Sequence, residues 1–299
     1  MTETEKSPMS TFKTVLHLFA IALLAPSFAP TQASAQNVRK IVLIASPKDH
    51  GLPGRHEYEK DLKVLAYCME HASNLKGITT KVVVGRATSM DDLKDAALIV
   101  IHGSGDRSSR ETNPLFPPNP RDPAPYPPET IAFLNNFDAL MKKGVGLAIL
   151  HYTTQVANET ARKDLLQWVG GYYLSEPGVR NNPRDEWSMT LKNPTHPVLR
   201  GIEPWTYKEE IFTKFLFADG VTPLIVATPA EATFGPREVA WAFQRTDGGR
   251  GFGFGGMDFH SGLALENPRR LLLNGLVWAA GMDVPAGGVA SIVPDELML

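Results

Sequence analysis

The residues of this chain that can do chemistry lie in four separate stretches. The first holds His151, which directly follows an apolar run from Val145 to Leu150. A histidine exchanges protons near neutral pH and is a common metal ligand. An apolar run without polar alternation is typical of a strand buried on both faces of a parallel sheet, and ligands bind beyond the carboxyl ends of such strands. His151 is therefore the first candidate for function; the alternative is a strand-end histidine that only bonds a loop carbonyl.

The second stretch is the loop after the first predicted strand, which contains His50, His56 and Glu57. Two histidines beside a carboxylate can bind a metal ion or transfer protons. The loop has neither the glycine spacing of a dinucleotide fingerprint nor the lysine of a P-loop, so we do not interpret it as a phosphate site. The alternative is an ordinary helix start, with Glu57 near the N-terminal dipole and both histidines solvated.

The remaining two stretches each pair titratable groups. Glu209 and Glu210 are adjacent, and paired carboxylates can raise one another's pKa and supply a general acid or base. Neighbouring residues on a strand point to opposite faces, so we expect one glutamate to face a site and the other to be a solvated charge. Asp258 and His260 follow the glycine-rich run Gly251–Phe254, again where a strand is predicted to end. Their alternative is a solvated surface turn.

The elements that position these groups alternate between apolar runs and helical patterns. This alternation through the first two thirds predicts an α/β fold with a doubly wound, mostly parallel sheet and a β-rich C-terminal part. The predicted strands are residues 40–45, 80–84, 96–101, 145–150, 187–191, 223–227, 239–243 and 251–254, and the predicted helices are residues 58–75, 128–143, 159–169 and 267–280.

A proline-rich segment runs from Pro114 to Pro128. Proline at this density cannot continue a helix or a central strand. We therefore predict a surface excursion near the strand ends that forms a rim or lid.

The N-terminal residues have the features of a secretory signal peptide. Lys13 precedes an apolar run, Val15–Ala25, and Ala33-Ser34-Ala35 matches a cleavage site. The run is too short to span a bilayer as a helix. We expect residues 1–35 to be removed, which leaves residues 36–299 as a single domain that is periplasmic or secreted and has no membrane span.

Composition excludes several classes of function. The formal net charge of -2, with no cluster of Lys and Arg among aromatic residues, argues against nucleic acid as a partner. The one cysteine, Cys68, excludes an internal disulfide framework, and its place in a helical pattern predicts a small buried hydrophobic residue.

Five stretches form an ordered series along nearly the whole chain: His50-Gly51 to His56-Glu57, Lys143-Gly-Val-Gly-Leu to His151-Tyr152, Gly170-Gly171-Tyr172-Tyr173, His196-Pro197-Val198 to Glu210, and Gly248 to Phe254. In this order they resemble the ThuA-like family, named for trehalose utilisation, and most of all its exported bacterial members. The resemblance covers Lys40 to about Val289 and rests on the series rather than on any single motif.

The resemblance implies a class I glutamine amidotransferase-like fold, which is a flavodoxin-type α/β sandwich. Amidotransferases of this fold carry their nucleophilic cysteine directly after a buried strand, whereas this chain has His151 at the matching place and Cys68 elsewhere. Amidotransferase chemistry is therefore not expected. The family is associated with uptake and breakdown of disaccharides, including sugars oxidised at a ring carbon.

The chain departs from the family pattern at two places. Relatives usually have an Asp-Glu pair followed by aromatic residues, where this chain has Glu209-Glu210-Ile211-Phe212. Relatives commonly have His-x-His after the glycine-rich strand, where this chain has Met257-Asp258-Phe259-His260. A metal site that depends on both of those histidines would be impaired here.

The leading hypothesis is an exported enzyme that acts on a disaccharide or keto-sugar glycoside by acid/base catalysis. A carbon beside a ring ketone is acidic enough for a positioned histidine or carboxylate to deprotonate. His151 is assigned as the base or its partner, Glu210 as the second acid/base group, and His56 with Glu57 as the orienting pair. Substrate binding is assigned to His50, Tyr152, Asp258 and His260.

Two alternatives stay open. One is a metal-dependent hydrolase, in which zinc or a similar divalent ion activates water and is held by a set drawn from His50, His56, His151 and His260. The other is a non-catalytic sugar-binding or accessory domain that keeps the same fold. All three interpretations share a small carbohydrate as the partner.

Overall fold

The computed structural model describes residues 38–86, 89–107, 112–118, 125–174, 182–232 and 234–299. The predicted signal peptide, residues 1–35, lies outside these residues. The described residues from Val38 onward belong to one compact unit, the extent we propose for the single domain. Within the described ranges, no helix is long and apolar enough to cross a membrane.

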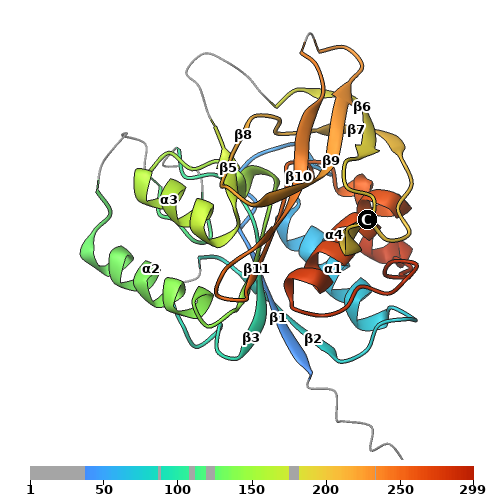
Figure 1. Cartoon of the computed structure of the whole chain (residues 1–299). Helices are drawn as coiled ribbons and strands as arrows, with labels where there is room; N and C mark the ends of the chain where they lie inside the picture. The colour runs from blue at the N-terminus through green and yellow to red at the C-terminus, as the bar shows by residue number, and fades with distance from the viewer. Residues whose placement is uncertain (1–37, 87–88, 108–111, 119–124, 175–181, 233) are drawn as a thin grey trace, which may run out of the picture. The chain divides into compact units, whose positions relative to one another are not determined.

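Over the described ranges the main sheet has nine strands, in the order β2-β1-β3-β4-β11-β10-β9-β6-β7 (Figure 1). Its first five strands are parallel neighbours. Their order is the 2-1-3-4-5 order of flavodoxin-like folds, which confirms the predicted α/β class. The bounds are β1 Arg39–Ala45, β2 Ile78–Val84, β3 Ala96–His102, β4 Gly146–Leu150 and β11 Arg250–Phe254.

The other strands form the β-rich later part. Strands β10, β9, β6 and β7 extend the sheet with antiparallel pairing. A separate pair, β5 and β8, was not predicted, because three residues are too few to show a periodicity. The bounds are β5 Gly171–Tyr173, β6 Arg184–Leu191, β7 Trp205–Glu210, β8 Phe215–Phe217, β9 Val221–Pro229 and β10 Arg237–Gln244.

Helices cover both faces of the parallel strands, α1 and α4 on one side and α2 and α3 on the other (Figure 1). Strand β1 shows why, because its side chains alternate between the two faces. Ile41 and Leu43 join the core under α1 and α4, whereas Val42 and Ile44 join the core under α2 and α3. The bounds are α1 Tyr58–His71, α2 Pro128–Met141, α3 Glu159–Trp168 and α4 Glu266–Ala279.

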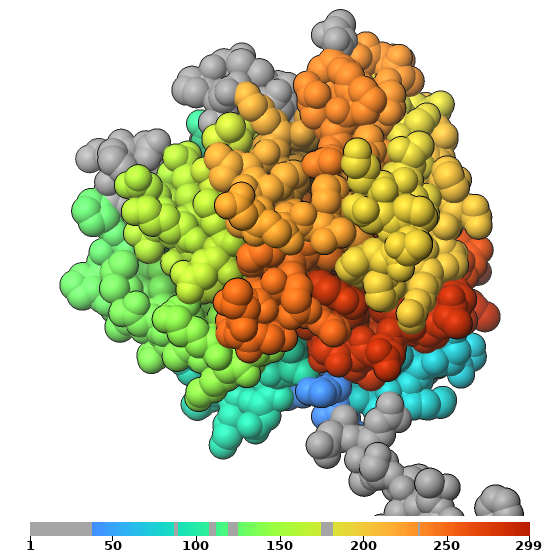
Figure 2. Space-filling model, in the orientation of Figure 1, coloured from blue at the N-terminus to red at the C-terminus, as the bar shows by residue number. Residues whose placement is uncertain are grey.

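The antiparallel part and the C-terminal residues form a continuous surface, coloured from yellow through orange to red in Figure 2. The carboxyl ends of β1, β3, β4 and β11 lie at one edge of the sheet, because these strands are parallel. The candidate histidines and Asp258 follow the ends of β1, β4 and β11, whereas Glu209 and Glu210 end β7.

The proline-rich segment is not wholly a surface excursion. Leu115 and Phe116 are buried, and the Phe116 ring stacks on Trp168 with 6.5 Å between centroids. The prediction of a rim or lid is therefore wrong for the first part of the segment, where apolar residues between the prolines join the core. Residues 119–124 lie outside the described ranges.

Candidate active site

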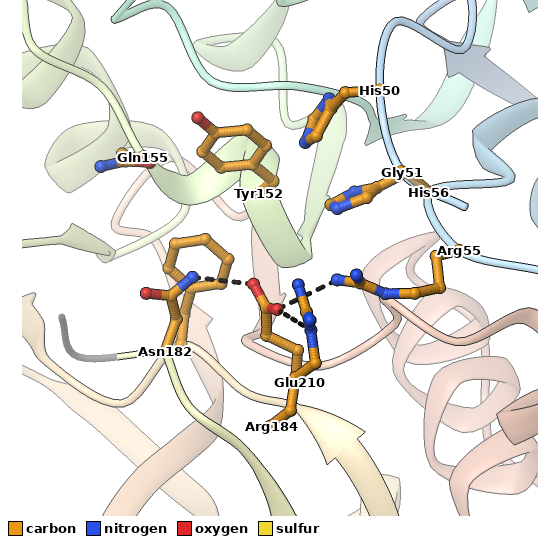
Figure 3. Close-up of a pocket in the computed structure, with 10 residues that line it drawn as sticks. His50, Gly51, Arg55, His56, Tyr152, Gln155, Asn182, Arg184 and Glu210 are labelled. Atoms are coloured by element: carbon orange, nitrogen blue, oxygen red, sulfur yellow. Dashed lines mark hydrogen bonds and ion pairs between the residues drawn. The ribbon is translucent and has the colours of Figure 1, made fainter.

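A polar cavity of about 330 Å³ lies where the parallel strands meet the antiparallel part (Figure 3). Its residues come from three regions: the loop between β1 and α1, the turn after β4, and the hairpin of β6 and β7 with its flanks. Its volume lies within the range of small-molecule sites. The lining residues are His50, Gly51, Arg55, His56, Tyr152, Gln155, Asn182, Arg184, Glu210 and Phe212.

Two histidines at this site have a left-handed backbone, His56 with φ 51° and His151 with φ 52°. This conformation is uncommon for residues other than glycine and costs on the order of 1–3 kcal/mol. At His151 the chain leaves β4 and turns at once into a short 3-10 helix, His151–Thr154, whose Thr154 hydroxyl donates to the His151 carbonyl. The turn points the imidazole across the end of the sheet.

The tautomer of His151 follows from its partner. The His151 ring is fully buried, and its Nδ1 lies 3.1 Å from the carbonyl oxygen of Gly255. A carbonyl only accepts, so Nδ1 carries the proton and donates. The other nitrogen, Nε2, is then an unprotonated lone pair, and it has no hydrogen-bond partner among the described residues.

The tautomer of His56 follows from a chain of hydroxyl groups. Ser104 donates its one proton to the Asp49 carboxylate at 2.6 Å. Tyr58 must therefore donate to Ser104, at 3.1 Å, and His56 Nδ1 must donate to Tyr58, at 3.0 Å. The His56 Nε2 atom is left unprotonated in the neutral ring, only 3.0 Å from Asp258 Oδ1.

Three side chains that each carry a lone pair, His56, His151 and Asp258, lie close together in a buried place. One ligand atom each from His56, His151 and Asp258 lies within 4.8 Å of the other two. Asp258 Oδ1, like His151 Nε2, is buried with no hydrogen-bond partner in the described part of the chain. Burying these polar atoms without partners lowers the stability of the fold, unless a cation binds between them. Imidazole and carboxylate are ligands that zinc and similar ions take.

The electrostatics keep both imidazoles neutral. Burial, together with the nearby His151, lowers the pKa of His56 to about 3. Burial also lowers the pKa of His151 to about 3, although the bond to Gly255 opposes this. A ligating histidine must be neutral, so the protonation states suit a metal ion. The residues present therefore fit a divalent cation.

Glu210 lies in the cavity as part of an ionic wall (Figure 3). Its carboxylate accepts from Arg55 at 3.0 Å, from Arg184 at 2.7 Å and from Asn182 at 2.8 Å. Arg55 also donates to Asp258 Oδ2 at 2.5 Å, so one guanidinium joins the ionic wall to the three-residue group. Because its carboxylate accepts from two arginines and an asparagine, Glu210 is better placed to hold these side chains than to exchange protons.

An aromatic wall and an exposed histidine complete the cavity. The Tyr152 and Phe212 rings stack with 5.6 Å between centroids. The His50 ring lies 4.1 Å from that of His56, and its Nδ1 is 2.5 Å from Asp49 Oδ1. The His50 side chain is 44% exposed, which makes it the imidazole most open to solvent at the site.

Of the residues assigned from the sequence, His151 and Asp258 lie behind His56 rather than in the cavity lining, and Glu57 and His260 belong neither to the lining nor to the three-residue group. Glu57 accepts from Lys48 at 2.5 Å and from the Gly54 backbone at 2.9 Å, so it closes its own loop. The carboxylate beside His56 belongs to Asp258, and the expected pairing of His56 with Glu57 is corrected. The two ring nitrogens of His260 contact Asp61 at 2.6 Å and the Leu297 carbonyl at 3.0 Å, which ties the C-terminal segment to α1.

The expectation for the glutamate pair also needs correction. Both side chains are buried, Glu209 at 1% exposure and Glu210 at 5%. The expected solvated charge is therefore absent, because Glu209 points to the core face of β7. Burial and the nearby Asp258 raise the pKa of Glu209 well above its ordinary value.

Sequence reasoning missed Arg55, Arg184 and Asn182 as lining residues. Arg55 stands beside His56 and could have been found from that motif. Arg184 precedes the strand start predicted at Trp187, and neither it nor Asn182 carries a local signal.

Comparisons with known proteins agree with this fold. The model of the ThuA family, described as trehalose utilisation, matches residues 130–279. A thua-like protein from Bacteroides uniformis has a similar structure, with a TM-score of 0.56 and 13% identity over 87% of this chain and 98% of that one. Another thua-like protein, from Parabacteroides merdae, has a TM-score of 0.54 and 15% identity over 86% of this chain and 98% of its own. At these identities the structures show a shared fold. No curated protein matches in sequence.

Proposed function

The chain belongs to the ThuA family, and from this we propose that it is a carbohydrate-processing enzyme whose centre is a divalent metal site formed by His56, His151 and Asp258. One observation carries the proposal. One ligand atom each of His56, His151 and Asp258 lies within 4.8 Å of the other two, all three residues are buried, and His151 Nε2 and Asp258 Oδ1 have no hydrogen-bond partner in the described ranges.

The low histidine pKa values favour this role over acid/base catalysis by the same rings. An efficient general base has a pKa near the working pH. Imidazoles with a pKa of about 3 are weak bases but are ready as neutral ligands. The proposed role of His151 therefore changes from base to metal ligand, and that of His56 changes from orienting residue to metal ligand.

A bound divalent ion would act as a Lewis acid and lower the pKa of water. The chain's own residues do the rest. Tyr58 and the Gly255 carbonyl fix the two imidazoles by accepting their Nδ1 protons. Such outer contacts orient metal ligands and raise their basicity. Asp258 is held by Arg55, which leaves Oδ1 directed at the histidines.

The cavity suits a sugar with a polarised oxygen. Guanidinium, amide and imidazole groups offer hydrogen-bond donors to hydroxyl groups, and Tyr152 with Phe212 offers an apolar wall. A ring ketone is an oxygen that such a site would polarise, which makes a keto-sugar glycoside or disaccharide the proposed substrate.

A second candidate keeps the substrate but needs no metal. His50 and Asp49 form a pair with 2.5 Å between Nδ1 and Oδ1, and His50 lines the cavity. A partly exposed imidazole next to a carboxylate is a suitable proton-transfer group. The proton taken from the carbon beside the ketone would then go to His50.

Metal analysis separates these candidates. Protein purified without chelator should hold one divalent ion per chain, and chelation should abolish turnover of a keto-disaccharide. Asp258→Asn should lose the ion, while Asp219→Asn, a matched change at an exposed site, should keep it. Turnover without metal would favour the His50–Asp49 pair. Sugar binding without turnover in any metal state would indicate an accessory domain.

We also propose that the protein is exported. The mature protein should begin at or near Gln36, and an N-terminal mass that still contains Met1 or Met9 would contradict a periplasmic or secreted location.

A further inference from the structure

Glu209 is a buried carboxylate with no place in the proposed chemistry. It does not line the cavity, because Glu209 and Glu210 point to opposite faces of β7. Its Oε1 atom accepts three backbone N–H groups, from Glu210 at 2.8 Å, Asp258 at 3.0 Å and Phe259 at 3.1 Å. A single oxygen thus joins strand β7 to the segment that carries Asp258.

We propose that Glu209 is a positioning residue that sets the metal ligand Asp258 by accepting the backbone N–H groups of Asp258 and Phe259. This inference rests on the proposed metal site. Glu209 acts through Asp258 and touches neither the substrate nor the two histidines.

The backbone before Asp258 needs such an anchor. Met257 has φ 96°, a left-handed conformation that side chains rarely adopt and that persists only when its surroundings enforce it. The preceding glycines pack closely, since a Cβ at Gly255 would lie 2.4 Å from the Phe212 carbonyl and one at Gly256 2.7 Å from the Phe254 ring. The segment is therefore fixed on both sides of Met257, by close packing before it and by Glu209 after it.

The segment is also joined to the loop that carries His56. The His56 N–H donates to the Asp258 carbonyl at 2.9 Å, and the His260 N–H donates to the Gly54 carbonyl at 2.9 Å. Through this short antiparallel contact, a shift of Asp258 would also move His56. Loss of the Glu209 acceptor should therefore disturb two of the three ligands.

What matters in Glu209 is the acceptor oxygen and not the charge. The three hydrogen bonds to Oε1 all come from neutral backbone groups. Glutamine keeps a carbonyl oxygen at that position, whereas methionine has nearly the same length and offers no comparable acceptor. The two variants differ chiefly in the property that the proposal needs.

The experiment compares Glu209→Gln and Glu209→Met with Glu186→Gln and Glu186→Met, a matched pair at an exposed site on the neighbouring strand β6. Two readouts are taken: the affinity for Zn²⁺ of metal-stripped protein, and hydrogen exchange of the Asp258 and Phe259 amides. Glu209→Met should lose about 10- to 100-fold in affinity, the usual cost of a lost outer contact. Glu209→Gln should stay near wild type, and both Glu186 variants should match it.

Exchange gives an answer even without metal. The Asp258 and Phe259 amides should be protected in wild type and in Glu209→Gln, and should exchange rapidly in Glu209→Met while the strand amides stay protected. Equal protection in all variants overturns the positioning role. If Glu209→Met does not fold, the test falls to Glu209→Gln. A loss of Zn²⁺ affinity in Glu209→Gln as large as that in Asp258→Asn would then overturn the positioning role. A wild type that binds no ion but shows the expected exchange pattern would remove the metal site and leave the positioning of Asp258.

Discussion

Substitution of His151 separates its backbone conformation from its role as a ligand. The residue has φ 52°, and asparagine adopts this conformation more readily than alanine. His151→Asn therefore keeps the turn after β4, while His151→Ala also destabilises it. Both variants remove Nε2, one of the three proposed ligand atoms.

The expected losses of stability differ. Both variants lose the hydrogen bond to the Gly255 carbonyl, which contributes about 0.5–1.5 kcal/mol. His151→Ala adds up to about 1 kcal/mol, because alanine adopts a left-handed backbone several-fold less often than histidine or asparagine, for a total of roughly 0.5–2.5 kcal/mol. At about 2–4 °C per kcal/mol for a chain of this size, Tm should fall by about 1–6 °C for Asn and about 1–10 °C for Ala.

The expected losses of function are alike. Each variant should lose more than the roughly 10- to 100-fold in metal affinity that follows the loss of an outer contact. Thermal unfolding of metal-free protein and titration with Zn²⁺ measure the two effects separately. Wild-type affinity in His151→Asn would remove His151 from the site. A lower Tm for Asn than for Ala would refute the account of the turn.

Three further predictions concern other parts of the molecule. Glu210→Gln should lower the free energy of unfolding by about 1.5–3 kcal/mol, the range for a hydrogen bond to a charged group, and leave Zn²⁺ affinity unchanged; urea unfolding and titration check this. In metal-free protein the unfolded histidines bind protons below pH 6.5, whereas folded His56 and His151 bind them only near pH 3. Stability should therefore fall as pH drops through this window, by at most about 1.4 kcal/mol per pH unit for each histidine, and a flat profile in urea would contradict it. Phe116→Ala should lower the free energy of unfolding by about 3–5 kcal/mol, measured by urea unfolding. A loss below about 1 kcal/mol, as expected for a surface substitution, would argue against a place for Phe116 in the core.

The parallel half of the fold could be predicted because each strand is a local signal. The unbroken apolar run before His151 has the composition of a doubly buried strand, and it became β4 with all five residues buried. Parallel strands share one carboxyl edge, so the loop holding His56 and the turn holding His151 could be expected to meet there. Their ring centroids lie 5.4 Å apart.

The partners of these histidines could not be predicted, because they depend on tertiary pairing. Asp258 reaches His56 through a contact between segments about 200 positions apart in the chain, and Arg55 shows the same separation from Asp258. Sequence proximity favoured Glu57 instead, whose side chain turns back to Lys48. The burial of Glu209 could not be predicted either, because the sequence around it does not show that three backbone N–H groups donate to its carboxylate.

A crystal structure of the protein soaked with Zn²⁺, with anomalous scattering recorded at the zinc edge, would locate the metal ion itself. We expect one strong anomalous peak about 2.0–2.2 Å from Nε2 of His56, Nε2 of His151 and Oδ1 of Asp258. A crystal with no peak at this position, or with zinc only on surface residues such as His71, would contradict the metal site.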